Sequence, residues 1–202
     1  MPRTAIISDI HGDLPRLHAV LADIAARNCT RIICLGDSVD ERASGRPVLT
    51  QLLRLNIPSV LGNCDQLCNL PQGSPEQAFV DALPRTITEG DALFIHISPI
   101  IGARGLRDTR DAKQLFQGSR QRLCFVGHIH VPAIFRNDLI NPDVATPVPF
   151  DYSTPIKLDA THRYAICVGA VGQSRDNIPA PRYAIWDRQQ DTIEIIRVAA
   201  PT

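Results

Sequence analysis

Apolar residues in the first third of the chain follow two alternating spacings. Short apolar runs predict buried strands at 4–8, 31–36 and 57–63. Between these runs, apolar residues recur at helical spacing over 14–28 and 46–55. The order strand, helix, strand, helix, strand predicts parallel strands joined by crossover helices.

The pattern changes along the rest of the chain. A helix, a hairpin and a second helix are predicted over 74–83, 85–98 and 110–119. Strand-like runs separated by turns follow at 122–130, 133–137, 155–159, 163–170, 182–187 and 192–198. From residue 133 onwards, the last third of the chain, we expect the strands to be mostly antiparallel. Four prolines within 141–155 predict an extended loop.

Composition and charge narrow the class of protein. The 202 residues are 44% hydrophobic, enough for one well-buried domain, which we expect to span 1–202. Basic and acidic residues both number 21, so nothing attracts the chain as a whole to nucleic acid or to anionic membranes. No apolar run is long enough to span a membrane, and Asp9 interrupts the N-terminal run, which argues against a signal peptide. Six cysteines without a CxxC pair predict a reduced, cytoplasmic protein.

Metal-competent side chains stand at the ends of five consecutive apolar runs. They are Asp9, His11, Asp37, Asn63, His96, His128 and His130. Open α/β sheets bind ligands beyond the carboxyl ends of their strands, so we expect these seven to meet in one cleft. If 122–130 is extended to its end, His128 and His130 point to the same face. Each residue alone could be a cap, a turn former or a hydrogen-bonded polar group, but the ordered set is hard to explain that way.

The donor set favours a pair of cations. Four imidazoles, two carboxylates and one amide offer nitrogen and oxygen ligands without a thiolate. Seven ligands are too many for one ion. Two ions about 3.5–4 Å apart that share a carboxylate and a water would use them well, and such a pair suits in-line attack on phosphorus.

Five short motifs occur in order along the chain. They are DIH at 9–11, GDSVD at 36–40, GNCD at 62–65, FIHIS around His96, and GHIH at 127–130. By these motifs, the chain resembles the calcineurin-like metallophosphoesterase superfamily. The tail at 167–187 also looks like the end of its small bacterial and archaeal phosphodiesterase branch.

The resemblance implies a fold and a division of the ligands. The fold is a four-layer αββα sandwich, with two mixed β-sheets face to face between helices. One ion would be held by Asp9, His11, Asp37 and His130, and the other by Asp37, Asn63, His96 and His128. Asp37 would bridge the two ions and would form the catalytic set with Asn63 and His96, acting through a metal-bridging hydroxide. Because histidine ligands disfavour magnesium, we expect manganese first, with iron, zinc, nickel or cobalt as alternatives.

Departures from the family pattern bear on the substrate. Cys64 stands where many members have a histidine thought to contact the phosphate or protonate the leaving oxygen. A thiol is a weak donor, so Cys64 predicts a bias towards esters with good leaving groups, although a packing role explains it equally well. The stretch 36–47 lacks the GDxxDRGP spelling of the protein-phosphatase and diadenosine-tetraphosphatase branches. In the tail, CVGAVGQSR replaces the usual NPGSVGQPR, but Arg175 remains as a candidate substrate-binding residue.

These observations predict a metal-dependent phosphoesterase acting on small phosphodiesters, with phosphomonoesters as a further class. Among enzymes, the alternative is a nucleotide pyrophosphohydrolase or a cyclic-nucleotide phosphodiesterase. The non-enzymatic alternative is a scaffold like the retromer subunit of the same superfamily, whose metal site is degraded. The expected partner is a small phosphoester rather than nucleic acid or a membrane, and a homo-oligomer stays open.

Overall fold

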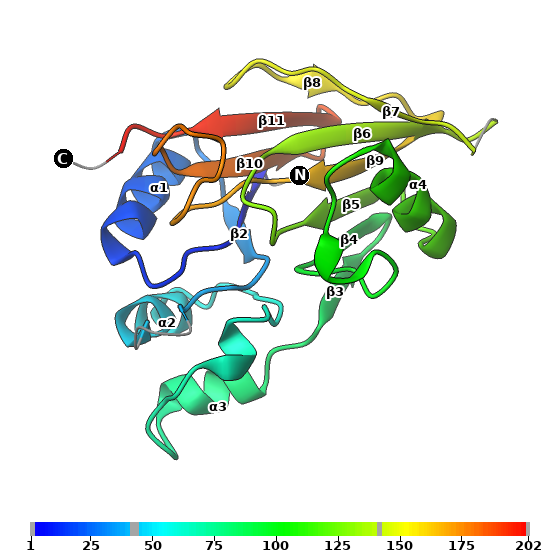
Figure 1. Cartoon of the computed structure of the whole chain (residues 1–202). Coiled ribbons are helices and arrows are strands. Elements are labelled where there is room, and N and C mark those ends of the chain that lie inside the picture. The colour runs from blue at the N-terminus through cyan, green and yellow to red at the C-terminus, as the bar shows by residue number, and fades with distance from the viewer. Residues whose placement is uncertain (1–2, 41–44, 141–142, 201–202) are drawn as a thin grey trace.

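Two mixed sheets form the centre of the molecule (Figure 1). This computed structural model describes residues 3–40, 45–140 and 143–200. The first sheet has the order β2 (Arg31–Cys34), β1 (Arg3–Ile7), β10 (Arg182–Asp187), β11 (Thr192–Arg197) and β8 (Ile156–Lys157). The second has the order β3 (Thr86–Glu89), β4 (Ala92–Ile95), β5 (Leu123–Val126), β9 (His162–Cys167), β6 (Ala133–Asp138) and β7 (Ala145–Pro147). The last third pairs mostly antiparallel, as predicted, although β9 also runs parallel beside β5.

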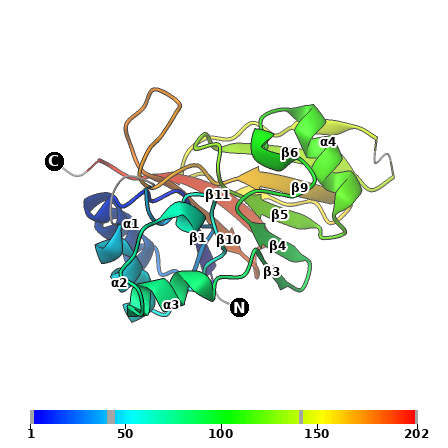
Figure 2. The same ribbon diagram turned by 60° about the horizontal axis from the view of Figure 1, so that its bottom comes forward.

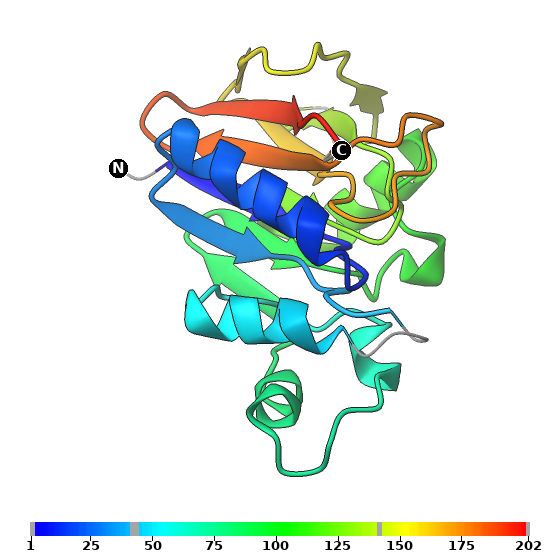
Figure 3. The same cartoon turned by 90° about the vertical axis from the view of Figure 1, so that its left-hand side faces the viewer.

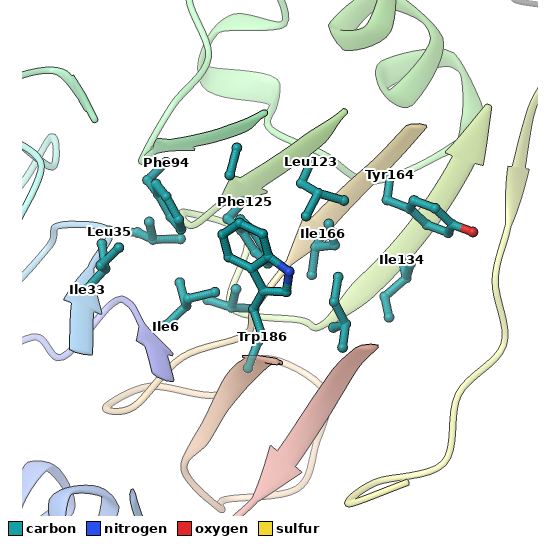
Figure 4. Close-up of a cluster of buried hydrophobic side chains, with 14 of the residues drawn as sticks. Ile6, Ile33, Leu35, Phe94, Leu123, Phe125, Ile134, Tyr164, Ile166 and Trp186 are labelled. Atoms are coloured by element: carbon teal, nitrogen blue, oxygen red, sulfur yellow. The ribbon is translucent and has the colours of Figure 1, made fainter. Parts of the chain in front are cut away.

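The inner faces of the two sheets share one hydrophobic core (Figure 4). Trp186 projects from the first sheet towards Phe94 and Phe125 of the second, with ring centroids 6.3 and 5.7 Å away. The two phenylalanine rings stack at 5.2 Å. Because side chains alternate along a strand, each sheet also has an outer face, and other elements must shield the apolar residues on that face from water.

Helices cover these outer faces. On the first sheet lie α1 (Leu14–Ala26) and α2 (Arg46–Arg54), and α1 buries Leu17, Val20 and Ile24 (Figure 3). On the second lies α4 (Thr109–Gly118), which buries Leu115 and Phe116 (Figure 2). A further helix, α3 (Pro75–Asp81), packs beside α2. The layers confirm the predicted αββα sandwich. Among the described helices, none is both long and apolar enough to cross a membrane.

The third predicted strand, 57–63, is reduced to a single bridge between Ser59 and β2. The carbonyl of Pro58 accepts a hydrogen bond from β2 at 2.9 Å, but a proline has no N–H with which to extend a ladder. The N–H of Val60 still donates to a β2 carbonyl at 3.0 Å, but the next N–H on that side, that of Gly62, donates to the Asp65 carboxylate at 3.0 Å. The segment therefore runs beside β2 without becoming a strand.

Two other boundaries differ from the sequence-based expectation. The strand predicted over 122–130 ends at Val126. The proline-rich segment 141–155 contains the short strand β7, which pairs with β6 at the edge of the sheet, while residues 141–142 lie outside the described residues. An edge position tolerates Pro147 because one side of the strand needs no partner.

Candidate metal centre

The seven predicted ligands converge at one edge of the two sheets. Asp9 and His11 follow β1, Asp37 follows β2, His96 follows β4, and His128 and His130 follow β5. Asn63 arrives from the segment beside β2. The distances divide these side chains into two donor groups.

Asp9, His11 and His130 form the first group, called the Asp9 group below. The Nε2 atoms of His11 and His130 lie 3.1 Å apart, and His130 Nε2 lies 3.2 Å from Asp9 Oδ1. The Asp9 carboxylate also accepts the backbone N–H of His128, at 3.0 Å. The side chains of Asp9 and His130 are almost completely buried.

Asp37, Asn63, His96 and His128 form the second group, called the His96 group below. His96 Nε2 lies 3.2 Å from Asp37 Oδ2 and 3.1 Å from Asn63 Oδ1. The His128 ring stands edge-on to that of His96, with centroids 5.5 Å apart. Asp37 Oδ2 is also 3.9 Å from His11 Nε2, so this carboxylate stands between the two groups.

Backbone carbonyls fix which nitrogen of three histidines faces the cluster. His96 Nδ1 contacts the carbonyl of Leu35 at 2.8 Å, His130 Nδ1 that of Gln173, and His128 Nε2 that of Ala103 at 3.0 Å. A carbonyl can only accept, so the contacting nitrogen carries the proton and the other is left to bind a cation. Burial lowers the pKa of His11 and His128, which favours the neutral form that ligates metals.

Imidazole nitrogens and carboxylate oxygens face one another in the cluster, so protons or cations must lie between them. Nε2 of His130 faces the Asp9 carboxylate, and Nε2 of His96 faces oxygen atoms of Asp37 and Asn63. Burial lowers the pKa of His96, but its hydrogen bond to Asp37 and the charges of Asp9 and Asp37 outweigh this and raise the pKa to about 9. Burial alone would raise the pKa of Asp9, but the interactions with His130 and His96 hold it well below its usual value. Divalent cations fit this donor set, because they can take the place of the protons.

Five of the seven candidate ligands have a left-handed backbone. Their φ angles are 54° at Asp9, 51° at His11, 51° at Asp37, 75° at His128 and 64° at His130. Non-glycine residues adopt such angles seldom, at a cost of about 1–3 kcal/mol each, and mainly at functional sites. The extended geometry expected for GHIH is therefore wrong. The chain turns at both histidines, and their rings reach different donor groups.

Two glycines let the backbone approach the ligands. A Cβ at Gly127 would lie 2.2 Å from Ser8 Oγ and 2.9 Å from His96 Nδ1. A Cβ at Gly62 would lie 2.2 Å from Asp37 Oδ1. A side chain at either position would displace a candidate ligand.

Asp65, the last residue of the GNCD motif, is a buried anchor for the turn that carries Asp37. Its carboxylate accepts the backbone N–H groups of Asp37, Ser38, Val39 and Gly62, at 2.8 to 3.2 Å. The motif alone leaves open whether Asp65 orients a ligand or merely ends a solvated turn. Its burial, at 1% exposed, excludes the solvated turn.

Arg182, which the sequence analysis missed, holds the loop beside His130. It is fully buried on β10. Its guanidinium contacts Ser174, Asp176, Ile178 and Ala180. These contacts fix the loop 173–181, in which the Gln173 carbonyl accepts the hydrogen bond from His130. The available signal was a charged residue beginning an apolar strand, since arginine is seldom fully buried without partners.

Of the two predicted substrate-binding residues, one lies at the cluster. Cys64 is buried, its Sγ lies within 4.8 Å of ligand atoms of His11 and Asp37, and its N–H donates to Asp37 Oδ1 at 2.8 Å. Arg175 is exposed on the loop 173–181, and its guanidinium makes no hydrogen bond or ion pair with any described residue.

A family model described as the calcineurin-like phosphoesterase superfamily domain matches residues 3–191. The chain belongs to this family. It is a metal-dependent phosphoesterase, as predicted, and the two donor groups of the phosphoesterase are the candidate residues for its metal.

Relatives of the phosphoesterase come from bacteria and archaea. The crystal structure of a metallophosphoesterase from Sphaerobacter thermophilus has a TM-score of 0.83 and 31% identity, covering 98% of this chain and 89% of its own. An uncharacterised protein of Methanocaldococcus jannaschii is 30% identical over 224 residues, which cover 96% of this chain and 86% of the relative. A hypothetical protein of Pyrococcus horikoshii OT3 shares the fold, with a TM-score of 0.67 and 15% identity over 100% of this chain and 90% of its own. The predicted small bacterial and archaeal type is confirmed.

Proposed function

We propose that the phosphoesterase hydrolyses small phosphodiesters, with phosphomonoesters as a further substrate class, and that it uses two divalent cations. One observation carries this proposal. The Asp37 carboxylate lies 3.2 Å from a nitrogen of the His96 group and 3.9 Å from a nitrogen of the Asp9 group. A carboxylate that stands between two sets of donors suits a pair of cations about 3.5–4 Å apart.

In this proposal, the Asp9 group and Asp37 hold one cation, and the His96 group, which includes Asp37, holds the other. When bound, the pair would make hydroxide available near neutral pH and neutralise charge on the phosphoryl oxygens. The imidazole-rich donor set favours manganese over magnesium, and iron, zinc, nickel and cobalt are the alternatives.

The chain's own residues divide the remaining work. Asp9, His96 and His130 are buried and close the back of the centre to water. Cys64 lies at the cluster but is a weak proton donor, so the departing oxygen receives little help and esters with good leaving groups react fastest. Arg175 is the proposed phosphate ligand, because an exposed and permanently charged guanidinium on the loop 173–181 can reach an incoming anion.

We assign the whole chain, 1–202, to one catalytic domain, since strands of both sheets deliver the ligands. The six cysteines are unbridged thiols, as suits the reducing cytoplasm. A scaffold with a degraded site is disfavoured, because all seven donors are present and five of them keep a strained backbone.

The test is metal content together with turnover. Purified protein loaded with manganese is assayed on bis(4-nitrophenyl) phosphate and on 4-nitrophenyl phosphate. We expect two manganese ions per chain, faster hydrolysis of the diester than of the monoester, and loss of both activities after chelation. Occupancy by two ions without turnover of either ester would contradict the proposal.

A further inference from the structure

A pocket of about 250 Å³ lies beside the His96 group. Two of its lining residues, Asn63 and His96, belong to that group. The Asp9 group contributes no residue to the lining. A molecule whose phosphate lies at the metal centre could therefore place a second chemical group in this pocket.

Fixed backbone contacts shape the walls of the pocket. The N–H of Leu61 donates to the carbonyl of Pro84 at 2.8 Å, which ties one wall to the start of β3. Thr86 of β3 lies opposite Ile95 of β4 in the strand pairing. Leu61 and Ile95 line the pocket together with the aliphatic side chains of Ile97 and Pro99. Such walls suit a flat apolar ring, which they contact without hydrogen bonds.

Polar groups complete the lining. Three exposed polar residues line the pocket, namely Gln66, Arg85 and Thr86. The Arg85 guanidinium makes no hydrogen bond or ion pair with any described residue. By contrast, the Arg104 guanidinium is held by two aspartates. Arg85 therefore has donors available for acceptor atoms on the edge of a bound ring.

The volume sets the size of the ring. A cavity of roughly 150 Å³ accommodates benzene, whereas drug-sized ligands occupy roughly 300–1,000 Å³. We propose that the pocket takes a heteroaromatic ring of nucleobase size, carried by the phosphodiester whose phosphate lies at the metal centre. This inference rests on the proposed function and narrows its substrates to esters bearing such a ring.

Two substrates with the same leaving group test the pocket. They are the 4-nitrophenyl ester of thymidine 5′-monophosphate and methyl 4-nitrophenyl phosphate. With manganese bound, we expect kcat/KM of the wild type to be about tenfold higher for the thymidine ester, because an apolar group in a fitted pocket is worth roughly 10–200-fold. An equal kcat/KM for the two esters would overturn the inference while leaving the proposed function intact.

Three variants locate the effect. Thr86→Trp fills the pocket and Arg85→Gln removes its free guanidinium, so both are expected to bring the ratio of the two kcat/KM values towards one. Arg120→Gln changes an exposed arginine outside the pocket lining and should leave the ratio as in the wild type. A ratio that Thr86→Trp leaves unchanged, with circular dichroism showing a folded protein, would place the base elsewhere and overturn the inference.

A binding experiment tests the pocket independently of turnover. In saturation-transfer NMR on the metal-free protein with thymidine, which carries the base without a phosphate, we expect transfer to the base protons in the wild type and its loss in Thr86→Trp. No transfer in the wild type would overturn the pocket. Transfer without hydrolysis of either ester would support the pocket and contradict the proposed function.

Discussion

The two donor groups offer the same chemistry but depend on different parts of the chain. In the Asp9 group, His130 is oriented by the carbonyl of Gln173, on a loop that Arg182 holds from β10. In the His96 group, His96 is oriented by the carbonyl of Leu35, at the end of β2. The part of the chain after His130 supplies no candidate metal ligand, but through Arg182 and the Gln173 carbonyl it sets the geometry of one group.

Exposure separates the groups as well. In the Asp9 group only His11 is half-buried, whereas in the His96 group both Asn63 and His128 are half-buried and the pocket adjoins that group. Buried ligands are held by packing and hydrogen bonds, so less freedom is lost when a cation binds. We therefore expect the Asp9 group to hold its cation more tightly and the His96 group to meet the substrate.

The largest effect is expected where the groups join. Asp37→Ala removes the carboxylate that both groups are proposed to share, so hydrolysis of bis(4-nitrophenyl) phosphate should fall to background and manganese should bind weakly at both positions. The measurements are the rate and the manganese content after dialysis. His18→Ala changes an exposed residue of α1 and serves as the control. Retention of more than a tenth of the activity would show that Asp37 is not shared.

His128→Ala separates the two groups. It removes a proposed ligand of the His96 group alone, so one manganese per chain should remain after dialysis while hydrolysis is lost. Metal analysis and rate assays on the same sample measure both quantities, again with His18→Ala as the control. Loss of both ions would mean that the groups do not bind independently.

Arg182→Met acts on the Asp9 group from a distance. Without the guanidinium, the loop 173–181 loses its anchor and His130 its orienting carbonyl, so the affinity of the tighter manganese site should fall about 10–100-fold, as is typical when a partner behind a ligand is lost. Calorimetric titration with manganese resolves the two sites. Arg188→Met, at an arginine that pairs with Glu89, is the control. An equal weakening of both sites would instead indicate a general loss of structure.

The smallest expected effect concerns protonation of the leaving group. Cys64→His adds a proton donor beside the centre, so esters with poor leaving groups should react about tenfold faster, below the usual 10²–10⁴ of a well-placed general acid. The measurement compares the hydrolysis rates of methyl 4-nitrophenyl phosphate and dimethyl phosphate. Cys64→Ser, which keeps the size of the cysteine side chain, is the control. A change confined to the nitrophenyl ester would show that proton donation does not limit the poor substrates.

The alternation of apolar runs was enough to predict the parallel start, the mostly antiparallel end and which side chains end the runs, whereas the sandwich was predicted from the family motifs. Those positions depend on local periodicity, which a sequence displays directly. It also predicted a strand at 57–63, which the missing N–H of Pro58 and the bond from the Gly62 N–H to Asp65 prevent. The family motifs then predicted how the ligands divide around Asp37, whose Oδ2 lies 3.2 Å from His96 Nε2 and 3.9 Å from His11 Nε2.

Two features of the site depend on long-range contacts and could not be predicted from the sequence. The left-handed backbone at His128 and His130 arises where the chain turns at the end of β5, whereas periodicity predicted a continued strand. Gln173 lies 43 residues from the ring that it orients. Its effect passes through a carbonyl that every residue type possesses, so no side chain marks it in the sequence.

Anomalous scattering from crystals grown with manganese, recorded at the manganese absorption edge, tests the central claim most directly. We predict two peaks about 3.5–4 Å apart, with the Asp37 carboxylate in contact with both. One peak should lie against Asp9, His11 and His130, and the other against Asn63, His96 and His128. A single peak, or two peaks that do not share Asp37, would contradict the two-group centre.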